Sequence, residues 1–402
     1  MRVLLLVITL LSVGSNICLP AQRPLPFPAL PRSTQTLPPD VSFCIVDGKF
    51  KNGTLKICEM GQGVVSGFLG HQRLFGIGSI WENAWKFFAK LPINTICHTH
   101  PKTHPARKDH FAFYEIERLK IPIYTTLQNI QQPALLVATE PFALFKHYDI
   151  ITQRYPNLMI LDDATKPFVL NKILTHLFFA DDPELEKLRP QCKIVPRIYS
   201  PTLAREITDT MPAQRYVIKP MNAIKGKGII FVEKKHLDNA LNLILTKPQH
   251  ARFKKRLQQE PFKFWTEYTK PFFLVESYEA SAPIISNNKP YDPTMRIAFG
   301  LSHFNGTVNI EFFGAYWKLP SKALDETGSL EEKFKSRIKP GTVCSARVDL
   351  QTYEQIKQIL SASMPTVYLK MIAARYNYEF LNTTRRQLGL GPYADDFSTN
   401  DA

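Results

Sequence analysis

The sequence predicts an α/β fold, and three observations support this. Short apolar or alternating segments typical of strands are interleaved with segments that have the apolar spacing of helices. Apolar residues make up 44% of the 402 residues and charged residues 21%, a composition that can bury a core. No apolar run reaches the roughly 18 residues of a membrane-spanning helix. The composition and the mixture of strand and helix patterns exclude collagen, coiled coils and small disulfide scaffolds.

The chain is basic, with 50 Lys and Arg against 35 Asp and Glu and a formal net charge of +15. Such an excess favours an anionic partner, such as phosphate, a nucleotide, nucleic acid or an acidic membrane face. No helix-turn-helix, zinc finger or aromatic ribonucleoprotein motif is present, so no specific nucleic-acid partner is expected.

The two ends of the chain have compositions of their own. Residues 1–19 predict a signal peptide, since Arg2 precedes an apolar stretch that small and polar residues follow. We therefore expect an exported or secreted protein, periplasmic or delivered to a host compartment, without a membrane span after cleavage. Residues 20–40 contain seven prolines and predict an extended linker. Residues 391–402 predict an acidic tail.

Residues 41–165 are expected to form an N-terminal α/β domain. Its predicted elements are strands over 41–46 and 55–58 with a turn at Asp47-Gly48, a helix over 80–90, and strands over 133–138 and 158–161. The many glycines between residues 61 and 78 indicate tight loops.

Two side-chain groups in this domain leave alternatives open. In an oxidising compartment Cys44 and Cys58 would close a short disulfide loop, although both also suit small buried positions. A histidine-rich segment suggests either a metal site or, as Pro101 and Pro105 favour, a polar surface loop. Its members are His98, His100, His104 and His110.

Residues 166–390 are expected to form a second domain that carries the chemistry. A helix with apolar residues at helical spacing contains Lys172, and a strand over 215–220 ends at Lys219-Pro220. The loop before the next apolar strand contains Lys225, Gly226, Lys227 and Gly228. Glycines let backbone N–H groups point into one concavity, and lysines add charge, so the loop suits phosphate binding; a basic hairpin turn is the alternative.

The downstream order of residues extends this pattern. A strand over 272–276 leads into Glu276, Tyr278 and Glu279, and a later strand contains Arg296. Asn305-Gly306 predicts a hairpin turn into a strand over 308–315, after which Lys318 follows.

This ordered set resembles the ATP-grasp superfamily over about residues 166–320. The resemblance implies an α+β domain with mixed or antiparallel sheets. It places Lys172 and Lys219 on ATP phosphates, and the loop of Lys225, Gly226, Lys227 and Gly228 over them. It also places the backbone near Glu276 and Tyr278 on the adenine edge, Glu279 on the ribose, Arg296 on the transferred phosphoryl group and Lys318 on the acceptor side.

The reaction implied by the resemblance is ATP- and Mg²⁺-dependent ligation of a carboxylate to an amine or thiol through an acyl phosphate. The usual Glu-x-Asn metal motif is missing. The candidate metal ligands are Glu311, Asp349, Glu379 and Asn382, the last two spaced for one face of a helix. The alternative is an exported nucleotide-binding or polyanion-binding protein without turnover.

Overall fold

The computed structural model describes residues 37–63, 68–76, 78–93, 95–99, 123–124, 134–138, 158–223, 226–246, 261–336 and 345–390. The predicted signal peptide, most of the linker, the acidic tail, Lys225 and the side chains of the histidine-rich segment lie outside them, and so export remains a prediction. Among these residues, no helix has both the length and the apolar character to cross a bilayer.

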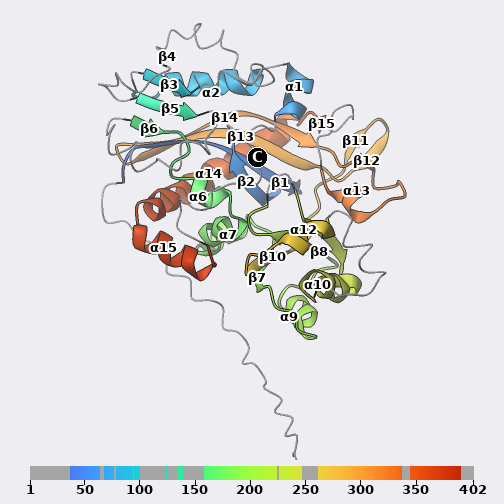
Figure 1. Cartoon of the computed structure of the whole chain (residues 1–402). Helices are drawn as coiled ribbons and strands as arrows, with labels where there is room; N and C mark the ends of the chain where they lie inside the picture. The colour runs from blue at the N-terminus through green and yellow to red at the C-terminus, as the bar shows by residue number, and fades with distance from the viewer. Residues whose placement is uncertain are drawn as a thin grey trace, which may run out of the picture.

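A five-stranded antiparallel sheet lies at the centre of the fold (Figure 1). Its order is β15-β14-β13-β1-β2, with β1 at Asp40–Lys51, β2 at Thr54–Gln62, β13 at Thr294–Phe304, β14 at Thr307–Lys318 and β15 at Ser345–Ala346. The first two strands, expected in the N-terminal domain, therefore share a sheet with the strand of Arg296. The domain boundary near residue 166 remains a prediction.

The predicted turn at Asp47-Gly48 is wrong. β1 continues to Lys51, and the chain turns at Asn52-Gly53, where both φ angles are positive at 51° and 74°. Asn-Gly and Asp-Gly both suit two-residue hairpin turns, and here Asn-Gly forms the turn. Asp47 therefore lies inside a strand and not at a hairpin tip.

The central sheet separates two cores because side chains alternate along β1. Val41, Phe43 and Ile45 pack in one core with α2, whereas Cys44 and Val46 pack in the other core with the long helix α14. The helices around this sheet are α1 at Leu69–Phe75, α2 at Ser79–Ala89, α14 at Leu350–Arg375 and α15 at Tyr378–Gln387. Cys44 and Cys58 are free thiols, so the suggested disulfide is absent.

A parallel sheet of order β4-β3-β5-β6 lies beside α2, on the same side of the central sheet (Figure 1). Its strands are β4 at Ile123–Tyr124, β3 at Thr95–Thr99, β5 at Ala134–Ala138 and β6 at Leu158–Ile160, which confirms the two strands predicted in this region. Parallel pairing together with the antiparallel sheets confirms the mixed α/β fold class.

A second antiparallel sheet, of order β7-β10-β8-β9, lies on the other side of the central sheet (Figure 1). Its strands are β7 at Cys192–Pro196, β10 at Phe272–Ser277, β8 at Arg215–Pro220 and β9 at Ile230–Glu233. The remaining elements are α6 at Lys166–Val169, α7 at Lys172–Ala180, α8 at Pro183–Glu186, α9 at Leu203–Thr210, η3 at Lys234–His236, α10 at Leu237–Thr246, α12 at Phe262–Glu267, α13 at Leu330–Phe334 and the hairpin of β11 (Ile284–Ser286) and β12 (Lys289–Tyr291).

A buried carboxyl at the start of β1 predicts a pH effect on stability. Burial, together with the charge of Asp163, raises the pKa of Asp40 to about 7, against the hydrogen bond from Tyr368. The folded protein therefore holds a proton that the unfolded chain loses near pH 4, and this contribution to stability falls as pH rises from about 4 to about 7. Asp40→Asn is expected to remove this pH dependence, which amounts to a few kcal/mol of unfolding free energy at most. Urea unfolding of both proteins at pH 4.5 and 7.5 measures the difference; equal pH slopes would contradict the prediction.

Candidate functional site

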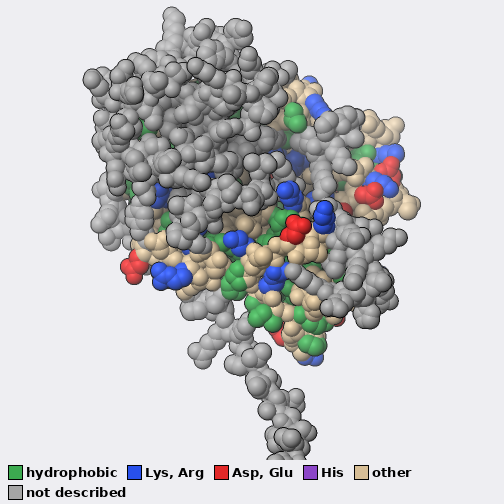
Figure 2. All heavy atoms as spheres, viewed as in Figure 1, with side chains coloured by type: hydrophobic (Ala, Val, Ile, Leu, Met, Phe, Trp, Pro, Cys, Tyr) green, Lys and Arg blue, Asp and Glu red, His purple; other side chains and the backbone are tan. Residues whose placement is uncertain are grey.

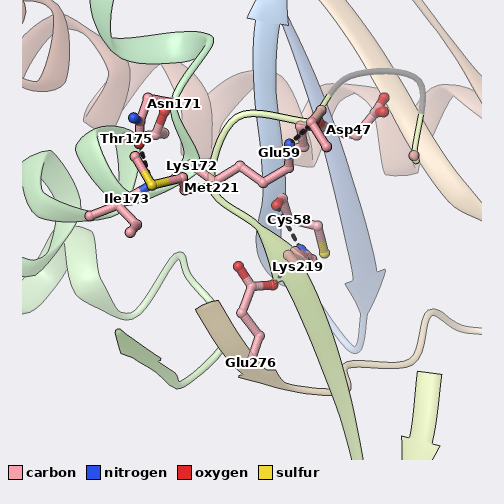
Figure 3. Close-up of polar contacts among 12 residues, drawn as sticks. Asp47, Cys58, Glu59, Asn171, Lys172, Ile173, Thr175, Lys219, Met221 and Glu276 are labelled. Carbon is pink, nitrogen blue, oxygen red and sulfur yellow. Dashed lines mark hydrogen bonds and ion pairs between the residues drawn. The ribbon is translucent and has the colours of Figure 1, made fainter. Parts of the chain in front are cut away.

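Lys172 and Lys219 come from different elements and meet at adjacent residues of β2. The Lys172 Nζ lies 3.3 Å from Oε1 of Glu59, and the Lys219 Nζ donates to the carbonyl oxygen of Cys58 at 3.1 Å. Figure 3 shows both side chains directed toward this part of the strand. Only 7% of Lys172 and 6% of Lys219 is exposed, so both cations are held inside the protein.

The local sequence explains how Lys172 reaches this position. Lys172 is the first residue of α7, and Asn171 before it is extended and accepts hydrogen bonds from Ile173 N and Leu174 N. Asparagine is a favoured N-cap because it satisfies such amides. The Lys172 amide donates to Met221 O at 2.7 Å and its Nζ donates to Ala223 O at 2.5 Å, which ties the helix start to the loop after β8.

Glu276 joins Lys219 to a second buried cation. Lys219 lies opposite Leu274 in the ladder, two residues before Glu276, so both side chains leave the same face of the sheet. Lys219 forms an ion pair with Glu276, and Arg189 Nη2 lies 3.2 Å from its other oxygen. Burial alone would lower the pKa of Lys219, but the charge of Glu276, its hydrogen bond with Lys219 and the nearby Cys58 together outweigh burial and raise that pKa.

Asp47 is the centre of a second charged group on the central sheet. Arg296 donates to both carboxylate oxygens of Asp47, from Nε and from Nη2, each at 2.7 Å. Lys318 Nζ contacts the same carboxylate at 2.5 Å. Burial would raise the pKa of Asp47, but Arg296 and Lys318 outweigh it and hold that pKa well below its usual range. Asp47 therefore remains ionised.

A β-bulge brings the two charged groups together. Asp47 lies opposite Glu59 and Gly48 lies opposite Ile57, so Cys58 is the extra residue of β2. A bulge re-aims side chains locally. Here it places Glu59 beside Asp47 while the Cys58 carbonyl faces Lys219. Burial would raise the pKa of Glu59, but the charges of Lys172, Lys219 and Lys318 together outweigh it, so that pKa is lowered and Glu59 is also an anion.

The glycine loop after β8 is held at its described end. Gly226 and Gly228 have φ angles of 69° and 67°, which glycine adopts without strain. Trp265 Nε1 donates to Gly228 O at 2.8 Å, and a Cβ added to Gly228 would lie 2.5 Å from Phe264. Lys227 is exposed. This end of the loop therefore requires glycine for both its backbone angle and its packing.

Two backbone amides at the end of β10 are already paired within the protein. Those of Ser277 and Tyr278 donate to Gln191 O and Arg215 O, at 2.8 and 2.9 Å. The adenine role of the backbone near Glu276 and Tyr278 remains a prediction. The Tyr278 hydroxyl donates to Asp292, and Glu279 accepts from Ser277 Oγ at 3.2 Å. The ribose role of Glu279 remains a prediction.

The structure does not gather the four predicted metal ligands. Glu311 pairs with Lys90 at 2.8 Å, and Asp349 caps the start of α14 by accepting from Thr352 N. Glu379 and Asn382 are exposed on α15, beyond the 26 residues of α14, which correspond to roughly 39 Å of helix. In the described ranges no three His, Cys, Asp or Glu side chains are grouped as metal ligands.

Asp47, Glu59 and Arg189 are the charged residues of this site that sequence reasoning missed. The sequence does contain a sign that the strand continues past Asp47, because the apolar strand pattern resumes at Phe50 and an Asn-Gly turn follows. That signal would have kept Asp47 inside the strand. Its contact with Arg296, 249 residues away, depends on the pairing of β1 with β13 and has no local signal.

Comparisons with known proteins give a likeness of fold only. No protein-family model matches the chain, and no curated protein matches it. Among solved structures, the chain is similar to D-cycloserine synthetase DcsG, at 13% identity over 68% of this chain and 82% of that one, with a TM-score of 0.35.

Two further solved structures give similar values. A structure described as a gamma-glutamylcysteine synthetase from Methylobacillus flagellatus KT has 10% identity, covers 85% of this chain and 89% of its own, and has a TM-score of 0.39. D-alanyl-alanine synthetase A from Vibrio cholerae has 14% identity, 59% coverage of each chain and a TM-score of 0.33. All three are named as synthetases, and the resemblance of this chain to the ATP-grasp superfamily remains a prediction from its sequence. Such scores carry no argument about activity, which must come from the site.

Proposed function

We propose that the protein is an ATP- and Mg²⁺-dependent ligase that joins a carboxylate to an amine or a thiol. The observation that carries the proposal is the meeting of Lys172 and Lys219 at β2, next to the group formed by Asp47, Arg296 and Lys318. Buried cations from separate segments suit a polyphosphate, because catalysis of phosphoryl transfer consists mainly of positioning and charge stabilisation.

Asp47 and Glu59 are the residues that would hold Mg²⁺. They face each other across the β1–β2 ladder, and both have lowered pKa values. Mg²⁺ commonly takes one or two carboxylates and completes its shell with phosphate oxygens and water, so a pair is sufficient. When bound, the ion would neutralise charge that develops on the phosphates.

The reaction consists of two transfers. A substrate carboxylate oxygen attacks the terminal phosphorus of ATP, which forms an acyl phosphate and releases ADP. The amine or thiol then attacks the acyl carbon, phosphate leaves, and the nucleophile loses a proton. Arg296 and Lys318 would stabilise the charge of the transferred group, since donors aimed at developing charge contribute most in a water-poor site.

Trapping of the acyl phosphate tests this function. Purified protein is incubated with MgATP, hydroxylamine and pools of carboxylates, and ferric-hydroxamate colour and ADP are measured together. The proposal predicts ADP and hydroxamate in equal amounts with at least one pool. Nucleotide binding without either product would instead indicate a binding protein. Binding that is lost between roughly 50 and 200 mM salt without preference for ATP would indicate a polyanion-binding protein.

Glu59→Gln is expected to raise the Mg²⁺ concentration that half-saturates ATP binding by about tenfold or more, because even outer-sphere partners of bound metals are worth 10- to 100-fold in affinity. Glu311→Gln is the matched control, since Glu311 pairs with Lys90 and lies outside the charged groups. Thermal stability at fixed ATP and increasing Mg²⁺ measures the effect. Equal Mg²⁺ dependence in Glu59→Gln and wild type would exclude Glu59 as a ligand.

A further inference from the structure

A loop that closes on itself leaves the central sheet directly after Lys318. We call residues 320–336 the strap. Pro320 and Ser336 form an antiparallel bridge, and Ser336 Oγ bonds Thr294 Oγ1 at 3.2 Å, two residues before Arg296. Both ends of the strap are thus anchored beside the Asp47 group, as in a compact Ω-loop.

Hydrogen bonds within the strap make it a single unit. Its short helix α13 begins with a capping box between Ser329 and Glu332, and Lys322 N donates to Glu332 O at 2.9 Å. Lys333 Nζ donates to Leu324 O at 3.0 Å. The strap is also bonded to the β11–β12 hairpin, because Leu324 N donates to Pro290 O at 2.7 Å. The strap and the hairpin lie side by side in Figure 1.

The strap crosses from the central sheet to the second antiparallel sheet through Phe334. This side chain is 6% exposed, and its ring lies 4.8 Å from the ring of Tyr278 and 6.4 Å from that of Phe231, centroid to centroid. The Arg215 guanidinium lies 4.9 Å from the same ring. Phe334 is therefore packed among residues of β8, β9 and the end of β10.

The next residue, Lys335, contacts the glycine loop. Its Nζ donates to the carbonyl oxygen of Gly226, 109 positions earlier in the chain, and only 9% of Lys335 is exposed. A Cβ added to Gly226 would lie 2.9 Å from Cε of Lys335, so the lysine stem also packs against the loop backbone. The loop is thus fixed at Gly228 by Trp265 and at Gly226 by Lys335.

We propose that Lys335 is a positioning residue of the nucleotide site, and this inference rests on the proposed function. By holding the Gly226 carbonyl, Lys335 orders the glycine loop before the nucleotide arrives. A glycine loop otherwise loses much conformational entropy on binding, and ordering it beforehand removes that cost from the affinity. Because the strap is anchored next to Lys318, the loop and the Asp47 group are held in one arrangement.

Lys335→Met is expected to accelerate hydrogen exchange of the amides at 226–229 in the nucleotide-free protein by about tenfold. It is also expected to weaken MgATP binding by a similar factor while leaving AMP binding unchanged, since AMP lacks the β- and γ-phosphates that the loop would cover. Lys335→Arg should keep hydrogen exchange and MgATP affinity close to their wild-type values. Lys333→Met is the matched control, because that lysine bonds only within the strap among the contacts described above.

The two readouts separate the possible failures. If wild-type protein binds no nucleotide, the proposed function fails, while hydrogen exchange still decides whether Lys335 orders the loop. Unchanged exchange in Lys335→Met would overturn the positioning role, and so would equal losses of ATP and AMP affinity. Lys335→Gln, which keeps a polar end, is measured in the same way if the Met variant does not fold.

Discussion

Lys219→Met is expected to remove about half or more of the thermal stabilisation that MgATP gives the wild-type protein. A buried charge-assisted hydrogen bond is worth about 1.5 to 3 kcal/mol, so its loss should weaken binding by roughly 10- to 150-fold. At a ligand concentration about 100 times the wild-type dissociation constant, the wild-type protein gains about 2.7 kcal/mol, and the variant should gain about 0.3 to 1.4 kcal/mol.

This variant is expected to fold. Glu276 keeps Arg189 as a partner at 3.2 Å, and therefore no uncompensated carboxylate remains. Lys56→Met is the matched control, because Lys56 also lies on β2 but bonds the carbonyls of Lys187 and Arg189. A nucleotide response in Lys219→Met equal to that of the control would remove Lys219 from the site.

Arg296→Met is expected to lower kcat by about 100- to 1000-fold and to change the affinity for MgATP by less than about threefold. The reason is that one donor aimed at developing charge is typically worth this much in the transition state and little in the ground state. The carboxylate of Asp47 retains Lys318 at 2.5 Å, so the charged group stays paired. Steady-state ADP formation and direct nucleotide titration measure the two effects.

Arg296→Lys separates charge from geometry. Lysine keeps the charge, but it lacks the planar fork by which Arg296 contacts both oxygens of Asp47. An intermediate kcat is expected. If Arg296→Met lost nucleotide affinity and kcat by the same factor, Arg296 would contribute to binding of the ground state. Its proposed role in stabilising charge on the transferred phosphoryl group would then be wrong.

Local patterns in the sequence predicted the elements that carry the two lysines. The β8–β9 hairpin, the helix of Lys172 and the Asn305-Gly306 turn all depend on spacing or turn chemistry within about ten residues. Asn305 and Gly306 both have positive φ angles, at 52° and 78°, as that turn requires. Short-range signals therefore located Lys172, Lys219 and Arg296 on their elements.

Long-range pairing explains what the sequence could not predict. Asp47 meets Arg296 only because β1 pairs with β13, and Glu59 meets Asp47 only because the bulge at Cys58 changes the register. The assignment of Glu379 and Asn382 to metal failed because it used helical spacing without a position for that helix. Nor could the sequence show that Arg215 O accepts from the amide of Tyr278, because that contact depends on how the strands pair.

The most direct test of the account is a crystal structure with Mg²⁺ and a non-hydrolysable ATP analogue. We expect phosphate oxygens within about 3.2 Å of the Nζ atoms of Lys172 and Lys219, and Mg²⁺ between those phosphates and the carboxylates of Asp47 and Glu59. A nucleotide bound elsewhere, with Lys219 still paired to Glu276 and Arg296 still paired to Asp47, would contradict the proposed site.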